Sequence, residues 1–544
     1  MKLNQLLKVG GVAFVATLGL AACSSSKSST ESSSTKNLNW QEQTELQTLD
    51  VSKVTDVVSE RAQENANEGL LTLANGNTLK PGVATSYKVS KDGKTYTFNL
   101  RKSKWSDGSK VTAKDFVYGM QRTVNPKTAS QYSYLLDHVQ NYAAVTKKTM
   151  PVSSLGVKAD GDYKLVVTLS KPQSYFKYIV SMPPLFPQSE KAVQKYGSSF
   201  GTKSSDQVYN GPYKVTGWNG SNDTWKLVRN KDYFNNKQTK LDQITFSVSK
   251  DPQTTLNEYQ SGKFDVATLS GKQQVNNFKK SPELNSLPES SNVYLQLNQK
   301  NPVLRNLNVR KALSLALDRK GLTNDVLGDG SFTANGFVPT DFVKHNGKEF
   351  SDQAAENNKF NAVTYNLSAA KKYWAKGLKQ LGKKKVTLTL VADDVSKDTK
   401  TTEALQSNLS KLPGLKVNNE NLPAKSASSY GQSGKFDLTL SLWIADYPDP
   451  ITFLQLLESN NSYNYGHWDN KQYNQYVDAA EGKDANDANK RWNDLVNAEK
   501  TLTNNVGVIP LYQQVLPQVR KDKVKGLVYS PTGQGFNFRY TSLK

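Results

Sequence analysis

Cysteine and histidine are scarce in this chain, which has one cysteine and three histidines among 544 residues. One cysteine excludes a disulfide framework, a zinc ribbon and an iron–sulfur cluster, and three histidines leave little room for a histidine-based metal site. We therefore expect neither a metal nor a cofactor. Long apolar runs are scarce too: the mean hydropathy is −0.63, and the single long run opens the chain, which argues against a polytopic membrane protein.

Catalytic motifs are also lacking. His138, His345 and His467 are far apart in the sequence, and none accompanies a G-x-S-x-G elbow or an H-E-x-x-H zinc motif. Segment 431–436 lacks the spacing and the following hydroxyl of a phosphate loop, so we interpret it as a turn at a hairpin or a helix exit. We predict no catalytic residue; a surface peptidase is the weaker alternative.

Acidic residues are outnumbered, with 48 Asp and Glu against 70 Lys and Arg and a formal net charge of +22. Such a balance fits nucleic acid, an anionic surface or a solvated basic exterior. Nucleic-acid binding would need aromatic residues interleaved with basic ones, whereas the lysine run 383–385 resembles a surface loop before a strand. We expect no nucleic-acid partner and a basic exterior beside anionic lipid and wall polymer.

The start of the chain is typical of an exported lipoprotein. Residues 1–22 combine a positive region with an apolar stretch too short to span a bilayer, which predicts a signal peptide. The tetrapeptide LAAC ending at Cys23 resembles the lipobox of bacterial lipoproteins, in which this thiol takes the lipid; a buried cysteine is the alternative. The Ser-rich segment 23–37 is expected to be a flexible tether. The predicted location is the outer face of the cell membrane.

The body of the chain alternates strand-like and helix-like segments, which favours a mixed α/β architecture. Asp92-Gly93 and Asp160-Gly161 each separate two segments of alternating hydrophobicity and predict β-hairpins. Thr112 and Asp115 can form a capping box at the start of a helix. Further helices are predicted over 308–317 and 491–502, the latter leading into a strand over 506–512. The basic residues of the first are expected on a solvated face: Arg310, Lys311, Arg319 and Lys320.

Several motifs occur together in an order that resembles one protein family. They are LKPGVATSY at 79–87, KWSDGSKVTAKDF at 104–116, NGPY at 210–213, NVRKAL at 308–313 with LDR at 317–319, and WIADY at 443–447. This set closely resembles the signature of family 5 extracellular solute-binding proteins, the oligopeptide- and dipeptide-binding lipoproteins of ABC importers. The similarity extends over nearly the whole mature chain.

The resemblance implies an α/β fold of the periplasmic-binding-protein type, with two lobes, a hinge and an additional inserted domain. An extended oligopeptide is expected between the lobes of a monomeric receptor, which delivers it to the membrane-embedded permease subunits of an ABC transporter. A peptide pheromone or another solute is the alternative ligand. The implied division is signal peptide 1–22, lipidated cysteine and tether 23–37, lobe 1 over 38–67, 196–293 and 516–544, inserted domain 68–195 and lobe 2 over 294–515.

Asp446 is the principal ligand-binding residue that the resemblance implies. In similar proteins the corresponding carboxylate takes the α-ammonium of the ligand, and a carboxylate between Trp443 and Tyr447 is costly to bury unless a cation meets it. A structural salt bridge is the alternative for Asp446. Asp449, which precedes Pro450, is expected to cap a helix instead.

Further ligand contacts are carried over from the family. Val57 is expected to offer backbone partners near the start of the peptide, and Tyr132 and Trp443 to flank its first residue, with core packing as the alternative for both rings. Ala445 and Tyr447 complete the predicted site. Some oligopeptide binders have a basic residue and a glycine where this chain has Leu440 and Leu442, and some relatives have an acid at Thr55. A salt bridge to the ligand carboxylate is therefore not implied.

Overall fold

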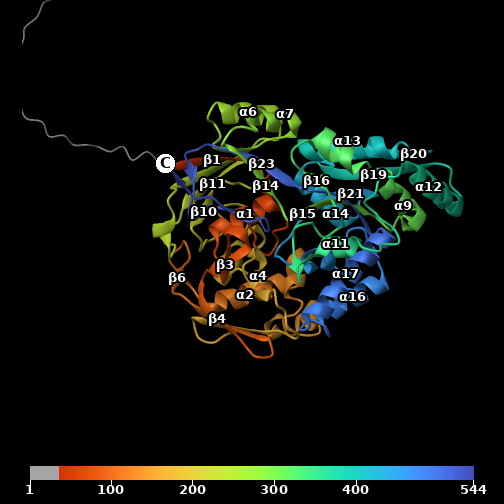
Figure 1. Cartoon of the computed structure of the whole chain (residues 1–544). Helices are drawn as coiled ribbons and strands as arrows, with labels where there is room; N and C mark the ends of the chain where they lie inside the picture. Colours follow the sequence, from red (N-terminus) through yellow and green to blue (C-terminus); the bar gives the residue numbers. More distant parts are fainter. Residues whose placement is uncertain (1–35, 534) are drawn as a thin grey trace, which may run out of the picture. The chain divides into compact units, whose positions relative to one another are not determined.

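The computed structural model describes residues 36–533 and 535–544. Two large β-sheets organise this part of the chain (Figure 1). In the seven-stranded sheet, β1 pairs in parallel with β12, from Asn37 opposite Gln243 to Glu42 opposite Val248. Its strands, in spatial order, are β10 (Tyr213–Thr216), β11 (Thr224–Arg229), β12 (Gln243–Val248), β1 (Asn37–Glu42), β13 (Val266–Thr268), β23 (Val515–Arg520) and β14 (Leu284–Pro288).

The six-stranded sheet is built from a later part of the sequence. Its strands, in spatial order, are β16 (Phe332–Thr333), β22 (Val508–Gln513), β15 (Ser291–Leu297), β21 (Leu438–Ile444), β19 (Val386–Asp393) and β20 (Leu415–Leu422). Strand β15 is buried along its whole length, as expected for a strand covered on both faces. The mixed α/β fold is therefore confirmed, whereas the residue limits of the individual domains stay a prediction.

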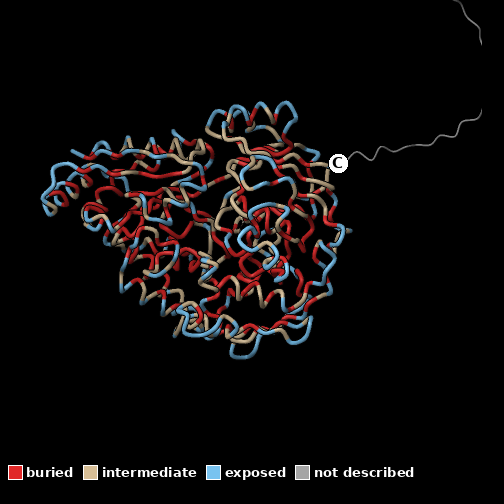
Figure 2. Tube along the Cα trace, turned by 180° about the vertical axis from the view of Figure 1, so that it is seen from behind, coloured by how far each residue is buried: buried red, intermediate tan, exposed pale blue. Residues whose placement is uncertain are grey.

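Helices cover both sheets. Helix α1 (Val57–Ala66) packs on β10 and β11, and α6 (Pro252–Gln260) packs on β13; Figure 1 shows α6 and α7 (Gly271–Phe278) on the other side of the seven-stranded sheet from α1. Helices α13 (Ser396–Leu409) and α14 (Ala424–Ser433) pack on β19 and β20. Their apolar residues supply the buried interior that Figure 2 shows in red.

Two short connections join the large sheets. One runs from β14 to β15 through Glu289 and Ser290, and the other from β22 to β23 through Gln514. They lie side by side, since the Glu289 N–H donates to the Gln514 carbonyl at 3.1 Å and Gln514 Nε2 donates to Glu289 Oε2 at 2.8 Å. Paired connections of this kind are where relative rotation of the two halves would be absorbed.

A four-stranded sheet in the order β4-β5-β9-β8 confirms both predicted hairpins. Gly93 and Gly161 adopt φ of +72° in the two turns, which glycine tolerates without a Cβ clash. Helix α2 (Ala113–Val124) covers this sheet and begins at the predicted capping box, in which the Thr112 N–H donates to Asp115 Oδ2 at 2.7 Å. The strands are β4 (Ala84–Val89), β5 (Thr95–Leu100), β9 (Lys164–Thr168) and β8 (Val157–Ala159).

One apolar core joins this region to the helices near the C-terminus. It includes buried residues from 70–185 and from 443–508, so α2 and α4 (Phe176–Ile179) lie close to α16 (Lys471–Glu481) and α17 (Ala488–Asn505) in Figure 1. Tyr175 and Tyr447 stack across this junction with ring centroids 4.7 Å apart. Helix α17 and β22 confirm the helix and strand predicted near the end of the chain.

The predicted helix over 308–317 corresponds to α9 (Leu307–Leu315), and Arg319 and Lys320 stand in the next helix, α10 (Arg319–Gly321). The expected solvated face is wrong for two of the four basic residues. Arg310 and Arg319 are buried, with exposed fractions of 5% and 3%. Arg310 donates to the carbonyls of Leu304, Arg305, Asn505 and Val506, and Arg319 to those of Pro510 and Ala362, among others. Each guanidinium therefore satisfies carbonyls at element ends that are buried from water.

Two smaller expectations are confirmed. Asp449 Oδ1 accepts the N–H of Ile451 at the start of α15 (Ile451–Leu454), and Gly434 ends α14 in the left-handed conformation at φ +69°, so segment 431–436 is a helix exit. Within the described ranges, no helix is both long and apolar enough to cross a membrane.

Candidate ligand-binding site

A cavity of about 380 Å³ lies between the two large sheets. One wall consists of the end of β1 and the first turn of α1. The opposite wall consists of β21 and the start of α13, and the paired connections at Glu289 and Gln514 close the back. Both walls are thus contributed by strand and helix ends, where unpaired backbone groups and side chains meet.

The edge of β21 supplies much of this cavity. Residues 439–444 all line it, and β21 pairs with β15 along its whole length. On the other side β21 pairs with β19 only at Leu438 and Thr439. Alternate residues beyond Thr439 therefore direct N–H and C=O groups toward the cavity, as an edge that can accept an added strand.

Asp446 lies just beyond this edge, with only 6% of its surface exposed. The Tyr132 hydroxyl donates to its Oδ1 at 3.3 Å and the Thr452 hydroxyl to its Oδ2 at 3.5 Å, which are long bonds for a carboxylate. No Lys, Arg or His among the described residues forms an ion pair with Asp446, so the alternative of a structural salt bridge is not observed. Burial raises the pKa of Asp446 well above its usual value, and the charge of Glu60 raises it further.

Aromatic rings surround this carboxylate. Tyr132 and Trp443 are both 7% exposed and both line the cavity. Tyr463 contacts both, with its ring centroid 5.4 Å from that of Tyr132 and 4.8 Å from that of Trp443. The indole N–H of Trp443 has no hydrogen-bond acceptor in the described part of the chain. Tyr132 and Trp443 therefore both pack in the core and line the cavity. The sequence had left these two roles as alternatives.

Tyr463 was not predicted. It stands in the loop between Leu457 and Lys471, which is rich in aromatic residues, and neither helical nor alternating periodicity marks it. The aromatic content of a polar loop is the only sequence signal that points to it.

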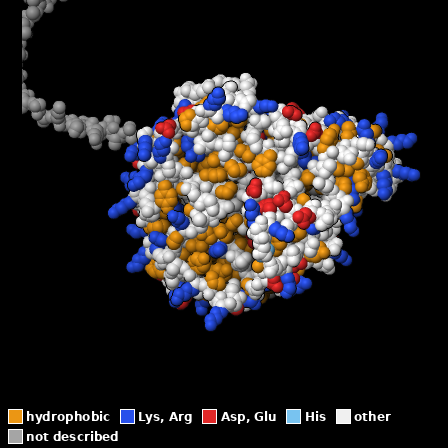
Figure 3. Space-filling model, in the orientation of Figure 1, with side chains coloured by type: hydrophobic (Ala, Val, Ile, Leu, Met, Phe, Trp, Pro, Cys, Tyr) orange, Lys and Arg blue, Asp and Glu red, His pale blue; other side chains and the backbone are white. Residues whose placement is uncertain are grey.

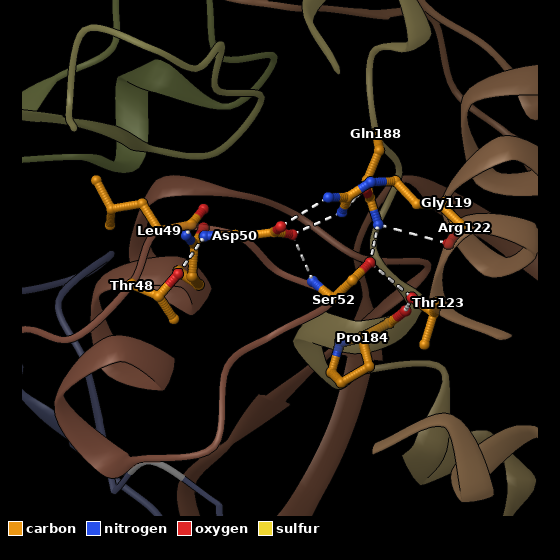
Figure 4. A network of polar contacts seen from close by, with 10 residues as sticks. Thr48, Leu49, Asp50, Ser52, Gly119, Arg122, Thr123, Pro184 and Gln188 are labelled. Atoms are coloured by element: carbon orange, nitrogen blue, oxygen red, sulfur yellow. Dashed lines mark hydrogen bonds and ion pairs between the residues drawn. The ribbon is translucent and has the colours of Figure 1, made fainter. Parts of the chain in front are cut away.

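A polar network fixes the wall opposite Asp446 (Figure 4). Both Asp50 oxygens accept from Arg122 of α2 at 2.6 Å. Ser52 contacts Thr123 of the same helix at 2.8 Å and accepts from Gln188 at 2.8 Å. The segment that leads to α1 is thereby held against α2, so the first turn of α1 faces the cavity as a rigid element.

The acidic side chains of the cavity have perturbed pKa values. On α1, burial and Asp56 raise the pKa of Glu60 to about 7, and burial raises the pKa of Asp56 to about 6. On the six-stranded side, burial and Asp398 raise the pKa of Asp393 to about 7, and burial raises the pKa of Asp398 to about 6. The remaining lining carboxylates are Glu42, Glu289 and Asp446, against two cations, Arg61 and Lys397.

The structure brings four of the predicted ligand-binding residues to the cavity and leaves two away from its wall. Val57, Tyr132, Trp443 and Asp446 line it. Val57 is the first residue of α1, and its N–H has no acceptor within the helix.

Ala445 and Tyr447 are fully buried and are not lining residues. The Ala445 N–H donates to the Ser290 carbonyl and its own carbonyl accepts from Gly533, both at 2.8 Å. The Tyr447 ring stacks on Tyr175 and its hydroxyl accepts from Gln455. Ala445 and Tyr447 thus hold the backbone on both sides of Asp446 in place from outside the cavity. The predicted lipid attachment site, Cys23, lies outside the described residues, and within those residues no cluster of His, Cys, Asp and Glu could hold a metal ion.

Comparison with known proteins identifies the family. Residues 78–465 match the family model described as bacterial extracellular solute-binding proteins, family 5. The chain belongs to this family. A dipeptide-binding protein of Lactococcus lactis subsp. cremoris is 34% identical over 561 aligned residues, covering 100% of both chains. OppA of Listeria monocytogenes bound to peptide is 34% identical, with a TM-score of 0.89 over 94% of this chain and 99% of that one.

Two further structures of the family allow the arrangement of the fold to be compared. The pheromone receptor PrgZ is 32% identical, with a TM-score of 0.88 over 94% of this chain and 100% of that one. The unliganded open form of the murein tripeptide-binding protein MppA is 27% identical, and its TM-score is 0.61 over 94% of this chain and 98% of that one. The two large sheets of this solute-binding protein are thus arranged more as in the peptide-bound relative than as in the open one.

Proposed function

We propose that this protein is a receptor for short peptides, held on the outer face of the cell membrane by a lipid on Cys23, that delivers its ligand to the permease of an ABC importer. The protein captures the peptide when the two halves of the fold close around it, and it catalyses no reaction.

Asp446 carries this proposal. It is a nearly buried carboxylate with two long hydrogen bonds and no ion pair with a described residue, in the wall of the cavity. A carboxylate in such surroundings is stabilised when a cation meets it. The α-ammonium of a peptide supplies this charge, and Tyr132, Trp443 and Tyr463 supply an apolar enclosure for the first residue.

The edge of β21 accounts for recognition of the rest of a peptide. A peptide that adds to Leu440–Ile444 as a strand would pair through its main chain, and main-chain pairing is independent of sequence. Such a receptor accepts many peptides, as a protein that supplies nutrients requires.

Anchoring and delivery rest on the sequence and on the family. The segment before Cys23 has the order of a lipoprotein signal, and relatives are named as peptide-binding proteins. Lys and Arg side chains are spread around the face drawn in Figure 3, which suits residence beside anionic lipid. Cys23→Ser should move the protein from the membrane fraction to the medium, and retention of the variant in the membrane fraction would contradict the anchor.

Native mass spectrometry of the purified protein tests the central claim. We expect co-purified masses that denaturation releases as peptides, and calorimetry should detect binding of a mixture of synthetic tripeptides to the emptied protein. A protein that carries only non-peptide solutes, and binds no peptide, would contradict the proposed function. Mass spectrometry of the peptides after incubation would also expose cleavage by a surface peptidase.

A peptide signal is the second candidate ligand, because the chain is similar over 94% of its length to a pheromone receptor. Uptake assays separate the two roles. A nutrient receptor restores growth of a peptide auxotroph on many peptides, whereas a signal receptor responds to one.

A further inference from the structure

The cavity is acidic although the protein is basic overall. Its two cations are already paired: Arg61 with Glu42, and Lys397 with Asp329, whose Oδ2 lies 2.8 Å from Nζ. Several lining carboxylates have no such partner. The charge of the cavity is therefore opposite to the net charge of the chain, and Lys and Arg side chains are spread around the face drawn in Figure 3.

Glu60 is a lining carboxylate without a bonded partner. Its side chain forms no hydrogen bond and no ion pair with another described residue, although only part of its surface is exposed. A role in capping α1 is already filled by Asp56, whose Oδ1 accepts the Ser59 N–H at 2.9 Å. The dipole of α1 and the neighbouring Arg61 favour a negative charge at Glu60, but no described side chain binds its carboxylate, which leaves it available to a ligand in the cavity.

Glu60 and Asp446 approach the cavity from opposite walls and act on each other electrostatically. The charged groups that act on Glu60 from its own side of the cavity are Asp56, the N-cap of α1, and Arg61, which is held by Glu42. One α-ammonium neutralises only one of the two facing carboxylates. A second buried carboxylate stays uncompensated unless the ligand has a second positive charge.

We propose that Glu60 is a specificity-determining residue that favours peptides whose first residue is Lys or Arg. The basic side chain places its charge at the Glu60 carboxylate while the α-ammonium meets Asp446. This inference rests on the proposed peptide-binding function and adds the chemical class of the preferred ligand. Complementary charges across a binding site favour the correct ligand and disfavour acidic ones.

Calorimetry with matched peptides tests the inference at pH 8, where Glu60 is ionised. The probes are Lys-Ala-Ala and norleucine-Ala-Ala, whose first side chains are similar in length and differ in charge. We expect the lysine peptide to bind the native protein about tenfold more tightly, and we expect Glu60→Gln to bring this ratio close to one. Circular dichroism and thermal unfolding show whether the variant is folded.

Asp398→Asn is the matched control, since Asp398 is another lining carboxylate whose side chain forms no hydrogen bond or ion pair with a described residue, on the opposite wall. It should leave the ratio near its native value. A native ratio of one or less would overturn the inference, as would an unchanged ratio in Glu60→Gln or an equal loss in Asp398→Asn. If neither peptide, nor any other peptide, binds the native protein, the proposed function itself fails.

Discussion

Lys250 and Asp394 join the two large sheets directly. Lys250 follows β12 in the seven-stranded sheet and Asp394 follows β19 in the six-stranded sheet, and Nζ lies 2.8 Å from Oδ1. The same Nζ lies 2.7 Å from Oε1 of Glu45. The arrangement of the sheets around the cavity is therefore held at its rim by an ion pair, besides the paired connections at the back.

Removal of this ion pair should speed ligand release. Lys250→Met is expected to raise the dissociation rate of a bound peptide by a factor of about 1.4 to 5, because a partly exposed pair contributes about 0.2–1 kcal/mol. Stopped-flow fluorescence measures the rate. Lys263→Met is the control, since Lys263 pairs with Glu258 within the seven-stranded half. Equal rates in the two variants would show that Lys250 does not hold the closed arrangement.

Asp446→Asn should weaken binding of peptides with a free amino group. Loss of the partner of a buried ammonium costs about 2–5 kcal/mol, and calorimetry measures it. Asparagine keeps the size and accepts from Tyr132, so folding should be unaffected. An affinity equal to that of the native protein would remove Asp446 from the site.

Binding should also depend on pH in a defined direction. The pKa of Asp446 is raised in the empty cavity, and a bound ammonium lowers it, so peptide binding releases protons and weakens as the pH falls. Calorimetry in buffers with different ionisation enthalpies counts the protons. In Asp446→Asn the part of this release due to Asp446 should disappear; an unchanged proton count would contradict the assignment.

The two ends of the peptide should contribute unequally to its binding affinity. Both lining cations already have carboxylate partners, and Leu440 and Leu442 occupy the positions where some relatives carry a basic residue and a glycine. N-terminal acetylation is therefore expected to weaken binding far more than C-terminal amidation. Competition with a fluorescent peptide measures both, and a larger effect of amidation would point to Lys397 as a carboxylate site.

The cavity acids should reduce stability at high pH. The pKa of Asp398 is raised from 3.8 to about 6 in the fold, so its contribution is fully present below pH 3.8 and is lost as the pH rises through 6. Asp398→Asn should raise the melting temperature at pH 8 and change it much less at pH 3.5. Asp522 has a lowered pKa from Lys525, and Asp522→Asn should give no stabilisation at pH 8. The same gain in both variants would contradict the linkage.

Arg491 should be essential for stability. It donates to both oxygens of Asp449 at 2.8 and 2.9 Å and to Glu481 at 2.9 Å. Arg491→Met leaves two largely buried carboxylates without this partner and should cost about 3–5 kcal/mol of unfolding free energy, measured by urea denaturation. Arg491→Lys keeps the charge but not the paired geometry, so its unfolding free energy should lie between those of Arg491→Met and the native protein. A loss below 1 kcal/mol in Arg491→Met would contradict this role.

Parts of the fold and of the site could be predicted from the sequence. The turns at Asp92-Gly93 and Asp160-Gly161, the capping box at Thr112 and the helix exit at Gly434 depend on residues close in sequence, and each formed as predicted. Asp446 could be proposed from the order of the family motifs. So could Tyr132, as a neighbour of the first ligand residue. Its hydrogen bond to Asp446 and the contact of Tyr463 with its ring could not, because no local pattern specifies how these segments pack together.

The other features depend on contacts between residues that are far apart in the sequence. Periodicity places Arg310 and Arg319 among the polar residues, but only the packing of their two helices against Asn505 and Pro510 shows carbonyls that need donors. The same applies to Tyr447, whose ring packs on Tyr175 outside the cavity. The scarcity of cysteine and histidine and the excess of basic residues were properties of the sequence alone. That the basic chain encloses an acidic cavity was decided only by the tertiary structure, because it depends on which few carboxylates the two sheets bring face to face.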